Sequence, residues 1–255
     1  MPSNDFQWST VKPELPVAGS TMAATFLKFT TNTKQPISGT DPFRLTVVKI
    51  WCFAGNDPNP RTAGSGVFIT DDVLLTSGHL LFNPEIFGPH RSGGYADHVR
   101  LTSPWLPIHP QAAASNRVVA APGWVKGSSP GADVGVIKLN LPVNPAANLT
   151  PVAASNTKLA NAAVRVYGFP LISQQLHYAS GTCVALQSQL IFHSADVGPG
   201  ESGSPLLAMI SDVPALVGLH RAGPGETPSG LPPSVSAFRL TRPALNWIQN
   251  VIPLL

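Results

Sequence analysis

Residues 198–205 read Gly-Pro-Gly-Glu-Ser-Gly-Ser-Pro, and this loop places one hydroxyl, that of Ser202, among residues that permit unusual backbone angles. A serine hydroxyl is a weak nucleophile. In acyl transfer it needs a neighbouring base and hydrogen-bond donors aimed at the oxygen that becomes negative. Gly200 and Gly203 flank Ser202 and would let a substrate carbonyl approach backbone N–H groups closely. The same composition is typical of an ordinary turn, so the loop alone indicates either a turn or a nucleophile.

Two upstream segments favour the nucleophile. His79 follows the apolar run Leu74–Thr76, and Asp133 directly precedes the apolar run Val134–Leu139. A histidine, an aspartate and a serine in this order along the chain match the order of the chymotrypsin triad. Asp97 is a rival for the acidic position, but no comparable apolar strand follows it.

On these three motifs the chain resembles the trypsin-like serine peptidases, and within them the glutamyl endopeptidase, or V8-like, branch. That branch carries a Gly-x-Ser-Gly-Ser-Pro turn and a later Gly-Ile/Val-His segment, which here reads Gly218-Leu219-His220. The resemblance extends from about Val47 to Ile252. It implies a serine endopeptidase with an all-β, chymotrypsin-like fold: two packed six-stranded antiparallel β-barrels and a C-terminal α-helix.

The resemblance also implies a division of the chain and roles for its residues. Residues 1–43 would be an N-terminal arm or propeptide. Residues 44–145 would form the first barrel, with His79 and Asp133, and residues 146–255 the second barrel, with Ser202 and the helix. Ser202 would attack a peptide carbonyl, His79 would move the proton, Asp133 would orient the imidazole, and the N–H groups of Gly200 and Ser202 would stabilise the oxyanion. A protease fold that has lost activity and serves as a binding module is the alternative.

Composition agrees with an all-β protein. Charged residues make up 11% and hydrophobic ones 43% of 255 residues, so the chain can bury a core and is not disordered. The 27 prolines and 22 glycines leave little room for long helices and favour short strands joined by turns. A net charge of +3 without a run of Lys or Arg argues against a nucleic-acid partner.

Other features exclude further classes of site. Cys52 and Cys183 would lie in different barrels, so we expect two buried thiols rather than a disulfide. No Cys-x-x-Cys or paired histidine spacing points to a metal, and no cofactor is expected. The apolar runs are too short for a membrane span. We therefore expect a monomer that acts on protein or peptide substrates. Residues 1–5 show no secretory signal, although the resembling family is mostly secreted, so no compartment is assigned.

Two side chains compete to set the residue on the acyl side of the cleaved bond. His220 stands where glutamyl endopeptidases keep the histidine that binds an acidic side chain, and an anion nearby could hold it charged around neutrality. Asp196 stands six residues before Ser202, where trypsin keeps the aspartate that selects Lys and Arg. The sequence favours glutamate, with a basic preference, or a packed histidine beneath a small apolar pocket, as alternatives. The expected pocket also includes Val197, Arg221 and Gly223.

Glu201 is the residue that departs from the pattern. The position before the nucleophile is usually Asp in trypsin relatives and often Asn in the V8-like branch. A glutamate here could receive a freed N-terminal amine, or it could distort the oxyanion turn, and the sequence leaves both possibilities open.

Overall fold

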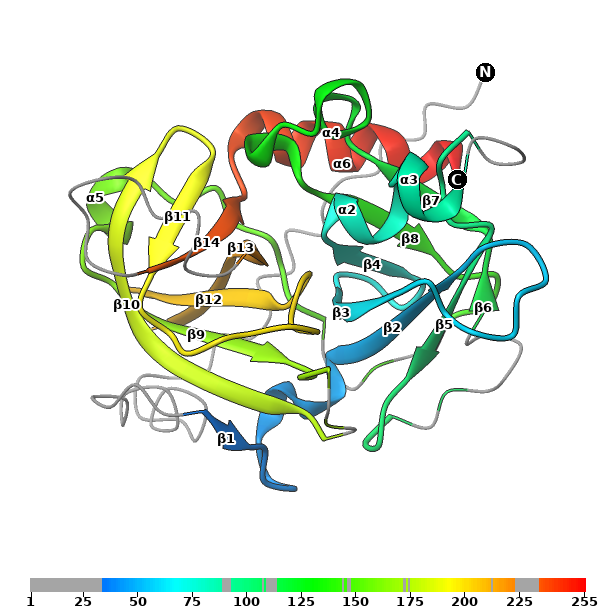
Figure 1. The fold of residues 1–255 in the computed structure, drawn as a ribbon. Coiled ribbons are helices and arrows are strands. Elements are labelled where there is room, and N and C mark those ends of the chain that lie inside the picture. The colour runs from blue at the N-terminus through cyan, green and yellow to red at the C-terminus, as the bar shows by residue number, and fades with distance from the viewer. Residues whose placement is uncertain are drawn as a thin grey trace, which may run out of the picture.

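The computed structural model describes residues 34–88, 93–106, 108, 114–143, 145, 148–171, 173, 175–211, 213–222 and 234–255. Its strands form two antiparallel sheets that stand side by side, and a C-terminal helix lies across one end of the pair (Figure 1). The predicted all-β, chymotrypsin-like fold with a C-terminal helix is confirmed. Most of the expected arm lies outside the described residues, which begin at Lys34.

The N-terminal sheet has the strand order β6-β5-β2-β3-β4-β8-β7. Its strands are β2 (Val47–Phe53), β3 (Thr62–Phe68), β4 (Val73–Thr76), β5 (His98–Thr102), β6 (Ala114–Ser115), β7 (Arg117–Ala120) and β8 (Gly135–Lys138). Only Asn116 separates the two edge strands, β6 and β7, so the chain itself joins the two edges of the sheet. The hydrogen-bonded ladder stays open there, and this sheet is a half-barrel rather than the closed six-stranded barrel that the resemblance implies.

The C-terminal sheet closes fully. Its order is β1-β10-β11-β14-β13-β12-β9, and β9 also pairs with β10, so six strands form a barrel with β1 added at the edge of β10. The strands are β1 (Gln35–Pro36), β9 (Ala163–Gly168), β10 (His177–Gln187), β11 (Leu190–His193), β12 (Pro205–Ile210), β13 (Val213–Ala222) and β14 (Val235–Arg239). The sequence reading missed β14, which directly precedes the C-terminal helix.

The helices of the described ranges are short, as the proline and glycine content predicts. They are η1 (Pro42–Leu45), α2 (Gly78–Leu81), α3 (Pro84–Phe87), α4 (Pro122–Gly127), η2 (Pro130–Ala132), α5 (Asn156–Leu159), α6 (Arg242–Val251) and η4 (Ile252–Leu254). None of them is long and apolar enough to cross a membrane. Helix α4 begins with Pro122, and a proline in the first helical turn is already in a helical conformation. Thr241 caps α6, since its hydroxyl accepts from the N–H of Ala244 at 3.4 Å.

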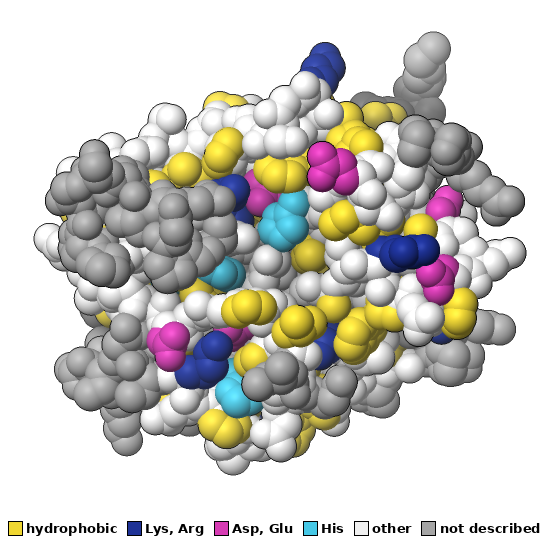
Figure 2. Space-filling view, viewed as in Figure 1, with side chains coloured by type: hydrophobic (Ala, Val, Ile, Leu, Met, Phe, Trp, Pro, Cys, Tyr) yellow, Lys and Arg dark blue, Asp and Glu magenta, His cyan; other side chains and the backbone are white. Residues whose placement is uncertain are grey.

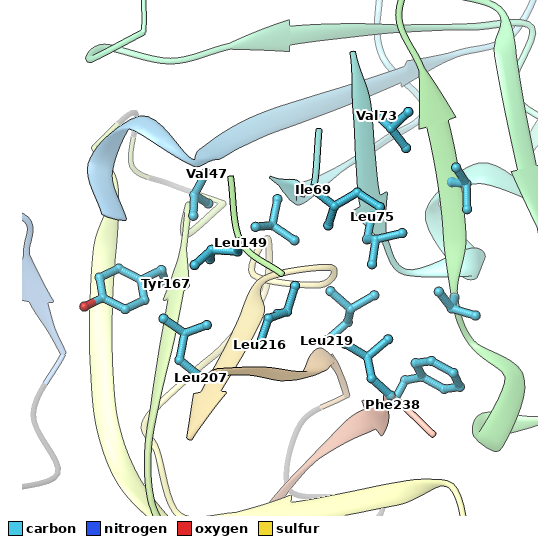
Figure 3. Packing of buried hydrophobic residues seen from close by; sticks show 14 of the residues in the cluster. Val47, Ile69, Val73, Leu75, Leu149, Tyr167, Leu207, Leu216, Leu219 and Phe238 are labelled. Atoms are coloured by element: carbon cyan, nitrogen blue, oxygen red, sulfur yellow. The ribbon is translucent and has the colours of Figure 1, made fainter. Parts of the chain in front are cut away.

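The largest apolar cluster lies between the two sheets. Val47 and Leu75 from the N-terminal sheet face Leu207, Leu216 and Leu219 from the barrel (Figure 3). All five side chains are fully buried. Separate clusters fill the barrel and the half-barrel. Burial of apolar surface contributes about 25 cal/mol per Å², so this shared cluster holds the sheets together and fixes their relative position.

A buried polar cluster attaches the segment after β1 to the barrel. The fully buried Arg165 donates to the Tyr167 hydroxyl at 2.6 Å and lies 3.9 Å from the Asp41 carboxylate. Its guanidinium also stacks 4.2 Å above the ring of Tyr178. Because a buried cation is costly without partners, the acceptors around Arg165 fix the path of the chain at Asp41.

The two cysteines are buried and unbridged. Burial raises the pKa of Cys52 to about 12 and that of Cys183 to about 11. Both therefore remain thiols at neutral pH and act as small apolar side chains.

Candidate active site

His79 and Asp133 are brought together by strand pairing. Strand β4 pairs with β8 so that Thr76 lies opposite Gly135, which puts the residues after β4 beside those before β8. The buried Asp133 Oδ2 accepts from His79 Nδ1 at 2.8 Å, and Oδ1 accepts from the His79 backbone N–H at 2.9 Å. With Nδ1 as the donor, Nε2 is the nitrogen left to accept a proton. The side chain of His79 is 27% exposed, so this nitrogen can reach a substrate.

A third donor reaches the same carboxylate from the other sheet. Arg221, on β13, donates from Nε to Asp133 Oδ2 at 3.3 Å and from Nη1 to the Ser236 hydroxyl at 3.3 Å. Burial is the largest single influence on the pKa of Asp133 and raises it. The charge and hydrogen bonds of His79, with the Arg221 guanidinium, outweigh burial, and the net pKa lies below its ordinary value. Asp133 is therefore a carboxylate at neutral pH.

The Ser202 loop is fixed to the opposite sheet through one residue of β3, Ser65. Its N–H donates to the Ser202 carbonyl at 2.8 Å, and its carbonyl accepts from the Thr76 hydroxyl at 2.7 Å. Its hydroxyl accepts from the Phe169 N–H at 2.9 Å and lies 3.4 Å from the Gly200 carbonyl. Gly203 has φ 82°, and a Cβ there would collide with the Ser65 carbonyl and the Thr76 hydroxyl. The loop therefore packs directly against the strands that lead to His79.

The peptide between Pro199 and Gly200 is oriented by a single hydrogen bond. The Leu171 N–H donates to the Pro199 carbonyl at 2.8 Å. Because the C=O and N–H of a trans peptide point in opposite directions, the Gly200 N–H is turned away from Leu171. In the described part of the chain no hydrogen bond uses the N–H of Gly200 or of Ser202.

The Ser202 hydroxyl donates to the Arg221 carbonyl at 3.4 Å. No hydrogen bond joins it to His79 among the residues that the structure describes. A hydroxyl hydrogen rotates freely and a serine side chain has three staggered rotamers, so the hydroxyl is not confined to this acceptor. Catalytic hydrogen bonds are often long in free enzymes and shorten when substrate binds.

Glu201 is 1% exposed and turns away from the substrate side of its loop. Its Oε2 accepts from Lys34 Nζ at 2.6 Å and from the Gly198 N–H at 2.7 Å. Burial raises the pKa of Glu201, and Asp196 adds to this, while Lys34 and Gly198 oppose it. The unusual glutamate before Ser202 is thus paired with the Lys34 ammonium.

The pocket residues separate into buried and exposed ones. His220 is 2% exposed and Val197 is 7% exposed, whereas Asp196 is exposed. The Asp196 carboxylate acts on Glu201, whose pKa it raises. Arg221 contacts Asp133, and Gly223 lies outside the described residues.

The state of charge of His220 is set by its burial. Burial lowers its pKa well below the ordinary value, and electrostatic interactions with His193, His79, Arg221 and Lys34 lower it further. Nδ1 of His220 is buried and has no hydrogen-bond partner among the described residues. In the free protein at neutral pH His220 is therefore a neutral imidazole.

Sequence reasoning missed four of these contributors: Ser65, Arg221 as a partner of Asp133, Lys34, and His193, whose ring lies 5.8 Å from that of His220. Only Lys34 had an indirect signal, which was the Glu201 carboxylate without an evident partner in the sequence.

Figure 2 shows a histidine side chain at the surface near the middle of the face in view, with basic and acidic side chains directly beside it. This position corresponds to the junction of the two sheets in Figure 1.

Comparison with known proteins agrees with this geometry. A family model described as a trypsin-like peptidase domain matches residues 64–216. Among curated proteins no significant match is found.

Solved structures share the fold at low sequence identity. A Glu endopeptidase in complex with MPD has a TM-score of 0.63 and 16% identity, covering 88% of this chain and 98% of that one. The protease Anisep from Arthrobacter nicotinovorans has a TM-score of 0.64 and 13% identity, covering 87% and 100%. A thermostable serine protease from an extremophilic microorganism has a TM-score of 0.60 and 15% identity, covering 82% of this chain and 98% of that one. At these identities the likeness establishes the fold alone.

The buried histidine on β11 gives a prediction about acid stability. Burial lowers the pKa of His193 to about 3, and neither ring nitrogen has a hydrogen-bond partner among the described residues. An exposed histidine has a pKa of about 6.5, so between these values the unfolded chain binds more protons than the folded one. The stability linked to His193 is therefore complete above about pH 6.5 and is lost as the pH falls toward 3.

In His193→Leu this dependence should disappear. The difference in unfolding free energy between wild type and variant should change by up to about 1.4 kcal/mol per pH unit below about pH 6.5 and stay constant above it. Urea unfolding of both proteins across this range measures the difference, and the plateau above neutrality serves as the internal control. A difference that does not vary with pH would contradict a buried neutral His193.

Proposed function

The chain belongs to the trypsin-like peptidase domain family, and we propose that it is a serine endopeptidase that uses Ser202, His79 and Asp133. The observation that carries the proposal is the convergence of two sheets. One holds a carboxylate–imidazole pair at 2.8 Å, and the other holds a serine next to the unengaged N–H of Gly200. In acyl transfer the serine needs the imidazole as its base, and the carboxylate–imidazole pair needs the serine as the nucleophile.

The reaction follows from this arrangement. Ser202 Oγ forms a bond to the substrate carbonyl carbon while His79 Nε2 takes the hydroxyl proton. The N–H groups of Gly200 and Ser202 donate to the resulting oxyanion. His79 then gives its proton to the departing amine as the C–N bond breaks, which leaves an acyl-enzyme. Water then attacks the acyl carbon while His79 takes one of its protons, and His79 returns that proton to Ser202 Oγ as the acyl C–O bond breaks.

Asp133 has an electrostatic role in these steps. Its carboxylate holds the imidazole by two hydrogen bonds, through the ring and the backbone of His79, and faces the positive charge that develops on the ring. Arg221 competes for the same oxygen at a longer distance, 3.3 Å.

One observation favours an inactive binding module instead. The Ser202 hydroxyl donates to the Arg221 carbonyl rather than to His79. If that hydrogen bond persisted with substrate present, the serine would not be activated, and the cleft would bind peptides without cleaving them.

Turnover by variants tests the proposal. Loss of the serine or the histidine of a triad costs on the order of 10⁶ in kcat, so Ser202→Ala and His79→Ala should lose cleavage of a mixed peptide library while remaining folded. Ser188→Ala, at an exposed serine in the β10–β11 turn, serves as the matched control and should keep wild-type activity. A wild-type protein that leaves the library intact but binds peptides would favour the binding module.

We further propose that the residue on the acyl side of the cleaved bond is acidic, with glutamate preferred. The support is electrostatic, because the groups that act on the buried His220 include His193, His79, Arg221 and Lys34, each a cation or able to become one, while Asp196 is exposed. A neutral imidazole still donates one hydrogen bond, and a substrate carboxylate would supply the missing anion. The Glu endopeptidase among the structural neighbours has the same fold.

Measurement of kcat/KM on matched peptides with Glu, Asp, Arg, Lys, Phe or Ala at that residue tests the preference. Glu should be best, and His220→Leu should lower its advantage over Ala by about tenfold or more, because a hydrogen bond to a charged group is lost. Asp196→Asn, the control for the other acidic candidate, should leave the order unchanged. A preference for Arg or Lys that disappears in Asp196→Asn would overturn the proposal.

A further inference from the structure

The carboxylate of Glu201 has an unusual pair of partners for a residue next to a nucleophile. It is almost fully buried, and its Oε2 receives both the Lys34 ammonium at 2.6 Å and the Gly198 N–H at 2.7 Å. Lys34 is the only cation that bonds Glu201 among the described residues. A buried carboxylate is strongly disfavoured without such a partner, so the position of Glu201 depends on Lys34.

The segment that carries Lys34 is anchored rather than loosely placed. Lys34 directly precedes β1, in which Gln35 and Pro36 pair with Tyr178 and His177 of β10. The next residue, Ile37, donates its N–H to the Leu176 carbonyl at 2.9 Å and buries its side chain between the sheets. Figure 1 shows β1 alongside one end of β10. The barrel thus presents the ammonium at a fixed place.

Glu201 connects this ammonium to the oxyanion donors. Its carboxylate closes the turn 198–201 by accepting from the Gly198 N–H, and the Glu201 N–H donates to the Gly198 carbonyl at 3.2 Å. The peptide that bears the Gly200 N–H lies inside this turn, and Gly200 holds a φ of 88°. A change in the Glu201 side chain would therefore move both the Gly200 donor and the adjoining Ser202.

We propose that the Lys34 side chain is a positioning residue for catalysis: its ammonium is a built-in counter-ion for Glu201 that holds the oxyanion turn in its working conformation. This inference rests on the proposed peptidase activity and adds a specific device to it. Since the ammonium already occupies the place at Glu201, a freed N-terminal amine is not required there. The chain would then be active without removal of the segment that precedes Lys34.

Substitutions at Lys34 test the device. Lys34→Met keeps the length of the side chain and removes the charge, Lys34→Arg keeps the charge, and Lys158→Met, at an exposed lysine on α5, is the matched control. In Lys34→Met, kcat should fall by about tenfold to a hundredfold with little change in KM, because the displaced donors act on the oxyanion, which forms only after substrate has bound. Lys34→Arg should restore most of kcat, and Lys158→Met should equal wild type.

A second readout does not depend on activity. Hydrogen–deuterium exchange of a peptide spanning residues 197–204 should be faster in Lys34→Met than in wild type and Lys34→Arg, because the turn loses its counter-ion. In Lys34→Met/Glu201→Gln, where no buried charge remains, exchange should return toward the wild-type rate.

The two readouts separate this inference from the proposed function. Faster exchange in Lys34→Met, in a protein whose wild type cleaves nothing, would uphold the Lys34–Glu201 device and overturn the peptidase. Wild-type turnover with equal kcat and equal exchange in Lys34→Met would overturn the device and leave the peptidase standing. Reduced kcat in Lys34→Met that Lys34→Arg does not restore would also overturn it, since charge would not be the cause.

Discussion

The hydrogen bond from the Ser65 N–H to the Ser202 carbonyl, 2.8 Å long, joins the two sheets at the point where the chemistry would occur. Ser65 belongs to β3 of the half-barrel and Ser202 to the loop before β12 of the barrel. The Ser77 hydroxyl adds a second link, because it donates to the His220 carbonyl at 3.0 Å. Both links require the apolar cluster between the sheets to be packed. Assembly of the site is therefore inseparable from the docking of the two halves.

The site holds several charges out of water, and each has a partner. Asp133 is paired with His79 and Arg221, and Glu201 with Lys34. Such pairs add little net stability, because desolvation offsets their attraction, but removing one partner leaves an uncompensated charge. They therefore fix geometry more than they strengthen the fold. His193 and His220 differ from these pairs, because burial keeps both imidazoles neutral. A substrate carboxylate could supply the anion that would pair with His220.

The sequence predicted those parts of the molecule that depend on local pattern. The apolar runs Leu74–Thr76 and Val134–Leu139 marked two strands, the proline and glycine content indicated short helices, and the glycines around Ser202 marked its loop. It could not predict contacts that depend on how distant segments pack. Lys34 lies 167 residues from Glu201, and Arg221 lies 88 from Asp133, so no local rule links them. The open edge between β6 and β7 and the low pKa of His220 are likewise consequences of tertiary packing.

The central claim is that Ser202 is a nucleophile activated by His79 across the junction of the sheets. Covalent labelling with a serine-directed peptidyl phosphonate bearing an acidic side chain, followed by peptide mapping in a mass spectrometer, tests it most directly. The account predicts one added phosphonyl group on the peptide that contains Ser202, and almost no labelling of His79→Ala in the same time. A wild-type protein that stays unmodified, or an adduct on another residue, would contradict it.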